Sequence, residues 1–121
     1  MNTTLIGRCG EDAAARYLVA EGYMIAERNF RTHTSELDII AYSKEGMICF
    51  VEVKTRKNAD FGYPCDAVNY RKRTKITQGA MSYIRSKHIE CEVRFDVIEV
   101  YGEFVGGVFA VSKVNHIKNA F

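Results

Sequence analysis

Residues 36–55 read ELDIIAYSKEGMICFVEVKT, and the pattern of this segment predicts a β-hairpin. Two runs rich in Ile, Val and Phe, residues 36–42 and 47–55, are typical of strands, and a short polar stretch separates them. Gly46 ends that stretch, which suits a three-residue loop whose last residue adopts the left-handed conformation. We therefore expect the two strands to pair in antiparallel fashion.

The loop also determines which residues of the two strands face each other. If it closes on a pair of Ser43 and Met47, stepping outward places Asp38 directly opposite Glu52. Alternation along the second strand puts Lys54 on the same face as Glu52, about 7 Å away. Two opposed carboxylates repel each other, and in a half-buried sheet they need a cation or a shared proton.

A divalent metal would meet that need, because Mg²⁺ prefers oxygen ligands and is usually bound by one or two carboxylates, waters and a substrate phosphate. Such an ion activates water and withdraws charge from a phosphodiester, while Lys54 would stabilise the attacking hydroxide or the developing oxyanion. The pattern therefore favours phosphodiester hydrolysis with Mg²⁺, for which Mn²⁺ could substitute. A structural alternative is a surface ion pair of Glu52 with Lys54 beside a solvated Asp38.

The rest of the chain predicts an α/β fold around this hairpin. The expected elements are a helix over 4–21, a strand over 23–30, the two hairpin strands, a surface loop over 57–65, a helix over 67–87, and strands over 93–101 and 108–112. This order, αβββαββ, predicts a sandwich with a central mixed sheet of about five strands flanked by helices. The length of 121 residues and the 47% apolar content fit one domain, 1–121.

Positive charge is concentrated in the middle of the chain. Residues 54–87 contain nine Lys and Arg and two acidic residues, a net +7, whereas the remainder carries −5. This division indicates a phosphate-facing surface beside a separate carboxylate site, with a solvated helix face as the alternative. The candidates for contacts with a nucleic-acid backbone are Arg56, Lys57, Arg71, Lys72 and Lys75.

The sequence lacks the signatures of several other classes of site. Its four cysteines are dispersed without a C-x-x-C pair, which excludes a zinc knuckle and a redox dithiol of the usual spacing. No P-loop, nucleophile elbow or dinucleotide-binding fingerprint occurs. The start of the chain lacks signal-peptide features and the apolar runs are too short to cross a bilayer, so we expect a cytoplasmic protein with no membrane partner.

Asp38, followed after 13 residues by Glu52-Val53-Lys54, resembles the PD-(D/E)XK nuclease motif. A wider set of blocks resembles the YraN-like family of uncharacterised bacterial proteins, which is similar in turn to archaeal Holliday junction resolvases. These blocks are Gly10-Glu11, Gly22-Tyr23, Arg28-Asn29, Ser35-Glu36-Leu37-Asp38, Phe50-Val51-Glu52-Val53-Lys54-Thr55-Arg56, Phe61-Gly62 and Arg94-Phe95-Asp96. The similarity spans nearly the whole chain.

The resemblance implies a restriction-endonuclease-like fold with a Mg²⁺-dependent nuclease site. In that site Asp38 and Glu52 would be metal ligands, the Val53 carbonyl could be a third, and Lys54 would be the catalytic lysine. Glu11 matches the helix-borne acid of the resolvase pattern and could hold a metal-bound water.

Other positions of the family pattern extend or modify this expectation. Glu36 matches the acid of the family's G-E-x-D string, and the family motif also has a lysine near Lys72. Ser35 replaces the usual Gly of that string, and Leu37 replaces the Pro of the nuclease motif. Asp96 also recurs in the family string, although its strand position fits a structural hydrogen-bonding role.

Together these features predict a Mg²⁺-dependent endonuclease that acts on DNA. The resolvase similarity further implies branched or structured DNA and, because resolvases act as symmetric pairs, a homodimer. A nucleic-acid-binding module that keeps the nuclease fold without catalysis is the alternative. A protein-interaction domain is a third reading, favoured if the protein fails to bind DNA at low salt.

Overall fold

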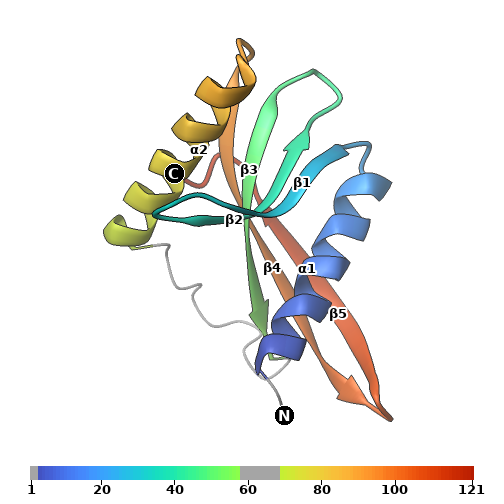
Figure 1. The fold of residues 1–121 in the computed structure, drawn as a ribbon. Helices are drawn as coiled ribbons and strands as arrows, with labels where there is room; N and C mark the ends of the chain where they lie inside the picture. The colour runs from blue at the N-terminus through green and yellow to red at the C-terminus, as the bar shows by residue number, and fades with distance from the viewer. Residues whose placement is uncertain (1–2, 58–68) are drawn as a thin grey trace.

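Seven helices and strands make up the part of the chain described by the structure, residues 3–57 and 69–121 of a computed structural model (Figure 1). They are α1 (Thr3–Ala20), β1 (Met24–Arg31), β2 (Glu36–Tyr42), β3 (Ile48–Arg56), α2 (Tyr70–Lys87), β4 (Val93–Val105) and β5 (Val108–Ile117). The strands form one open sheet in the order β1-β2-β3-β4-β5, in which β3 and β4 are parallel and the other neighbours antiparallel. The predicted α/β class, mixed five-stranded sheet and element order are confirmed.

The predicted hairpin register is confirmed at the turn between β2 and β3. The Ser43 amide donates to the Met47 carbonyl at 2.9 Å, and Gly46 has φ +84°, the left-handed conformation. Ile39 pairs with Val51 at the other end of the β2–β3 ladder. One further step in this register brings Asp38 opposite Glu52.

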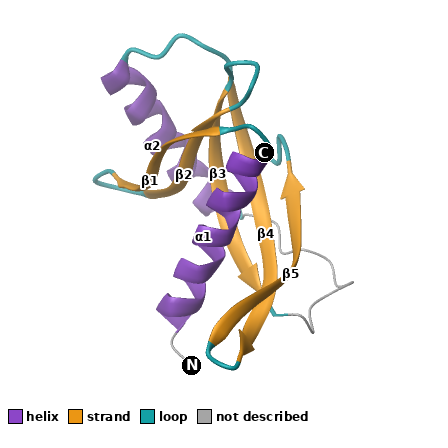
Figure 2. Cartoon of the chain, turned by 90° about the vertical axis from the view of Figure 1, so that its right-hand side faces the viewer, coloured by secondary structure: helices purple, strands orange, loops and turns teal. Residues whose placement is uncertain are grey.

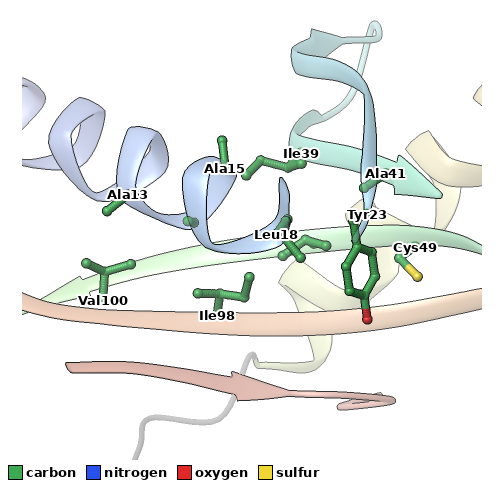
Figure 3. Close-up of a cluster of buried hydrophobic side chains, with 11 residues drawn as sticks. Ala13, Ala15, Leu18, Tyr23, Ile39, Ala41, Cys49, Ile98 and Val100 are labelled. Carbon is green, nitrogen blue, oxygen red and sulfur yellow. The ribbon is translucent and has the colours of Figure 1, made fainter. Parts of the chain in front are cut away.

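The two helices cover opposite faces of the sheet (Figure 2). Under α1, a cluster of small and branched side chains packs around the fully buried Leu18 (Figure 3). Under α2, Phe50 packs with Tyr83 and other apolar residues. Alternation along β3 separates the two sets, since Val51 faces α1 whereas Phe50 faces α2. Even-numbered residues of β3 therefore face α2, and Glu52 and Lys54 share that face.

Several boundaries differ from those predicted. Strand β4 runs to Val105 and β5 to Ile117, because pairing with buried β4 extends β5 through a segment with little alternation of its own. Helix α2 is described from Tyr70, and the side chain of Asn69 caps it by accepting from the Lys72 amide at 2.8 Å. The predicted loop lies outside the described residues except for Lys57, and so does the predicted helix start at residues 67–68.

Helix α1 lies unusually close to β3 at Gly10. A Cβ atom at this position would lie 1.9 Å from the Thr55 hydroxyl oxygen, so a glycine is required for the helix to pack here. Glu11 follows Gly10 directly, so this close contact between α1 and β3 helps to position Glu11 on the sheet. Neither of the two described helices has the length and apolar character needed to span a membrane.

Candidate functional site

Asp38 and Glu52 form an acid pair across β2 and β3. Glu52 is buried, Asp38 is half-buried, and the two carboxyl groups share a hydrogen bond. Burial, together with the adjacent charge of Glu52, raises the pKa of Asp38 to about 8, although a hydrogen bond from the Val53 amide to Asp38 Oδ2 at 2.9 Å acts in the opposite direction. The pair therefore favours a proton or a cation at neutral pH.

Asn29 flanks the same pair on the other side of β2. The β1–β2 register pairs Arg28 with Ile39 and Phe30 with Leu37, so Asn29 lies opposite Asp38. Its φ of 52° is in the left-handed region, which Asn tolerates better than most other residues. The sequence signal for this role was an Asn inside a strand, and spacing alone did not connect it with Asp38.

Glu11 approaches the acid pair from α1. Its pKa is raised mainly by burial, while a hydrogen bond to the side chain of Asn29 and the charge of Arg28 lower it. The charge of Glu11 in turn contributes to the raised pKa of Asp38. Asn29 thus connects α1 with the strand that carries Asp38.

Glu36 lies at the exposed start of β2, and no contact joins it to Asp38 or Glu52 in the described residues. Its carboxylate is 3.6 Å from Arg31 Nε, and both side chains are solvent-exposed, so this ion pair is weak. Across residues 3–57 and 69–121, no three His, Cys, Asp or Glu side chains are grouped so that they could hold one metal ion. The described part of the chain therefore offers a cation two carboxylates, supplemented by backbone oxygen.

Lys72 reaches the acid pair from the first turn of α2. Its Nζ lies 2.5 Å from Glu52 Oε1, and the Lys72 side chain is about half exposed. Burial alone would lower the pKa of Lys72, but the hydrogen bond with Glu52 and the negative charges of Glu52 and Asp38 outweigh it and raise the pKa. A residue expected to contact a nucleic-acid backbone is therefore also the counter-ion of Glu52.

Lys54 is half-buried on the same face as Glu52. Within the described parts of the chain it makes no hydrogen bond or ion pair. In the parallel ladder it pairs with Glu99 of β4, which is fully buried. Lys54 thus shares a sheet face with Glu52, two residues along β3, and makes no ion pair with it in the described residues.

The other basic residues that the sequence predicts to contact nucleic acid differ in their exposure. Lys57, Arg71 and Lys75 are exposed, the last two on α2. Arg56 is half-buried, and its Nε lies 3.5 Å from a carboxylate oxygen of buried Glu99. That carboxylate also accepts from Asn115 Nδ2 at 2.8 Å, which ties Arg56 to the sheet.

Asp96 belongs to a separate buried network on the α1 face. Arg94 donates to both of its carboxylate oxygens at 2.8 and 2.7 Å, and His116 Nε2 lies 2.7 Å from Oδ2. Burial alone would raise the pKa of Asp96, but the hydrogen bonds from His116, Arg94 and the Asn119 amide lower it to about 2. This network is structural, and it lies away from Glu52, which faces α2.

The fold and the acid pair define an α/β protein whose central hairpin carries two adjacent carboxylates. The model of "Uncharacterised protein family UPF0102" matches residues 10–100, and the chain belongs to this family, as its sequence blocks predicted.

Three relatives in the family cover between 78% and 100% of this chain. A UPF0102 protein of Clostridioides difficile is 44% identical over 122 residues, covering 100% of both chains. One from Trichlorobacter lovleyi is 45% identical and covers 96% of this chain and 89% of its own length. One from Clostridium acetobutylicum is 54% identical over 95 residues, 78% of this chain and 77% of its own.

Among solved structures, Pyrococcus furiosus SfsA in complex with Ca²⁺ is similar to this chain with a TM-score of 0.48 and 18% identity. The match covers 93% of this chain and 64% of that one. A similarity of this extent assigns neither a ligand nor an activity here.

Proposed function

We propose that this protein is a Mg²⁺-dependent nuclease that hydrolyses phosphodiester bonds of DNA at the Asp38–Glu52 acid pair. The observation that carries the proposal is the juxtaposition of these two carboxyl groups, inside the sheet, across adjacent strands. Structural carboxylates are normally placed opposite a cation, as Asp96 is opposite Arg94. Opposed acids are typical of a site that binds a positively charged ligand.

The donor set suits a hard divalent cation. Mg²⁺ needs only one or two protein carboxylates, because it keeps several waters and takes substrate phosphate as a further ligand. Asp38 and Glu52 would hold the ion, and the Val53 carbonyl could complete the protein ligands. When bound, Mg²⁺ or Mn²⁺ supplies Lewis-acid polarisation of the phosphodiester and lowers the pKa of coordinated water.

Three side chains of this protein would then act on the reaction. Lys54, which shares the sheet face of Glu52, would stabilise negative charge that develops on the phosphate oxygens. Lys72, which pairs with Glu52 in the absence of a metal, would release Glu52 to the ion and contact a substrate phosphate. Glu11, which approaches from α1, would orient a water at the edge of the site.

Exposed basic side chains support DNA as the substrate. Arg71 and Lys75 on α2 and Lys57 at the end of β3 would contact phosphates, with Lys72 available when Glu52 has another cation. Branched DNA and a homodimer are parts of the same proposal, drawn from the resemblance to resolvases, and a cytoplasmic location is proposed with them.

A cleavage assay with matched variants tests this function. Linear duplex, flap and four-way junction DNA are incubated with Mg²⁺, Mn²⁺ or chelator. We expect metal-dependent cleavage that falls at least about 100-fold in Asp38→Asn and Lys54→Met. Glu90→Gln removes an exposed acid outside the site and serves as the control. Unchanged cleavage by Asp38→Asn would show that the activity belongs to a contaminant or to another site.

The ion pair of Lys72 with Glu52 favours a second function, a nucleic-acid-binding module without catalysis. An internal ammonium already compensates part of the acid pair's charge, so the pair can be stable without a metal. This function predicts salt-sensitive DNA binding with no heat of Mn²⁺ binding in calorimetry. Measurable Mn²⁺ binding that Asp38→Asn abolishes would decide for the nuclease.

A further inference from the structure

A cavity of about 710 Å³ lies on the α1 face of the sheet, next to the acid pair but distinct from it. It is formed where the N-terminal half of α1 runs beside the ends of β3, β4 and β5 (Figures 1 and 2). The lining residues that matter here are Gly7, Glu11, Val53, Lys57, Phe104 and Phe109. Its volume is in the range of small-ligand sites.

Two glycines keep this cavity open. Nothing lies within 4 Å of the place where a Cβ of Gly7 would be, so the absent side chain leaves free space on α1. At Gly102, a Cβ would lie 2.9 Å from the ring of Phe109, so the glycine allows that ring to lie against β4. The rings of Phe104 and Phe109 contact each other at a centroid distance of 5.4 Å and line the cavity together.

The chemistry of the lining matches a nucleotide better than an apolar ligand. Aromatic rings offer a surface on which any base can stack, and the exposed cationic residue Lys57 belongs to the same lining. Glu11 adds an acceptor that could bind the amino edge of a base. A base can enter such a recess only when it is outside the duplex stack.

The cavity is also connected to the proposed reaction site. Val53 lines it, and the amide of Val53 donates to Asp38. Glu11 also lines the cavity, and the negative charge of Glu11 contributes to the raised pKa of Asp38. A nucleotide bound here would therefore lie against Val53, the residue whose amide contacts Asp38.

We propose that this cavity binds one unpaired nucleotide of the DNA substrate, with its base against Phe104 and Phe109. The inference rests on the proposed function and narrows its substrate to DNA with a nucleotide outside the duplex stack, as at a bulge, flap or branch point.

Fluorescence anisotropy in chelator tests the proposal without cleavage. Two labelled duplexes are compared that differ by one unpaired nucleotide at the centre. We expect the wild type to bind the bulged duplex about fivefold or more tightly than the paired one, which is the lower end of what stacking of one base contributes. Equal affinities would overturn the proposal.

A cavity-filling variant locates the effect. Gly7→Leu places an apolar side chain in the open space and replaces a poor helix former with a good one, so the fold should be retained. We expect this variant to bind both duplexes equally. Ala20→Leu adds the same side chain at an exposed position on α1 and should keep the preference. A preference that persists in Gly7→Leu, or is lost in Ala20→Leu as well, would overturn the proposal.

A second variant keeps the test decisive if Gly7→Leu does not fold. Phe104→Leu removes an aromatic face at a half-buried position and keeps most of its apolar volume, and we expect it to lose the preference. Adding Mg²⁺ to the same samples separates the two proposals. Cleavage of DNA without tighter binding of the bulged duplex overturns the cavity proposal alone. Tighter binding of the bulged duplex without cleavage overturns the nuclease proposal and leaves the cavity as a nucleotide-binding site.

Discussion

The Glu52 carboxylate has neighbours of both signs of charge. Asp38 lies beside it across the hairpin, and Lys72 contacts it from α2. The charges on these three groups are therefore interdependent, and a change at one of them alters what the other two bind. This coupling leads to two predictions at the scale of single residues.

Asp38 should make the stability of the protein depend on pH. Its pKa is about 8 in the folded state against an ordinary value of 3.8, so the folded protein retains a proton that the unfolded chain has released. The contribution of protonated Asp38 to the free energy of unfolding is then fully present below about pH 4, and it is lost as the pH rises toward 8. Asp38→Asn mimics the protonated form and should remove this loss.

Urea unfolding in chelator at pH 5 and pH 8 measures the effect. We expect the stability of Asp38→Asn relative to wild type to be greater at pH 8 than at pH 5 by on the order of 2 kcal/mol. Glu90→Gln should show no such change. A constant difference between the two pH values would mean that Asp38 is ionised in the folded protein.

Lys72 should compete with a divalent cation for Glu52. Removing the ammonium in Lys72→Met leaves the acid pair without its internal positive charge, so Mn²⁺ should bind about three- to tenfold more tightly. Calorimetric titration with Mn²⁺ measures the affinity. Lys87→Met, at the opposite end of α2, is the control. Weaker binding by Lys72→Met alone would show that the lysine supports the ion instead of competing with it.

At the scale of elements, the packing of α1 on β3 depends on Gly10. Gly10→Ala would place a methyl group against the Thr55 hydroxyl, forcing the helix away from the strand, and should destabilise the protein by about 1–3 kcal/mol. Gly7→Ala, with open space at its Cβ, should be neutral or stabilising by up to about 1 kcal/mol. Urea unfolding of both variants checks this. Equal stability of the two would show that the Gly10 contact relaxes freely.

The β2–β3 hairpin could be predicted because its signals are local. The position of Gly46 and the apolar runs on both sides set the register, and the register alone brings Asp38 opposite Glu52. The length of β5 could not be predicted, because its second half is a strand by virtue of pairing with β4. The contact of Lys72 with Glu52 was also missed, since it depends on where α2 packs.

At the scale of the whole molecule, the Asp96 network connects elements from both ends of the chain. Asp96 and Arg94 come from β4, His116 comes from β5, and Tyr17 of α1 hydrogen-bonds to His116 at 3.1 Å. The network fixes the outer strand and α1 relative to each other. Its role in the protein is therefore to stabilise the fold. Loss of the network should leave Asp38 and Glu52 in place.

Asp96→Asn should lower the free energy of unfolding by about 3 kcal/mol at neutral pH, because it leaves half-buried Arg94 without the charge of its fully buried partner. With a folded pKa of about 2, below the ordinary 3.8, Asp96 stabilises the protein above about pH 4, and that contribution is lost as the pH falls toward 2. Denaturation at pH 7 and pH 3 measures both effects. A variant as stable as wild type at pH 7 would contradict the assignment.

The parallel pairing of β3 with β4 has a consequence for the order of folding. The hairpin joins neighbouring segments and can close early, whereas α2 must cross the sheet before Lys72 arrives. A half-folded chain would then present both acids with no ammonium beside them and would itself attract divalent ions. Ligands that also bind incompletely folded chains stabilise less. If magnesium binds the acid pair as proposed, it should therefore raise the melting temperature by less than its affinity for the native protein implies.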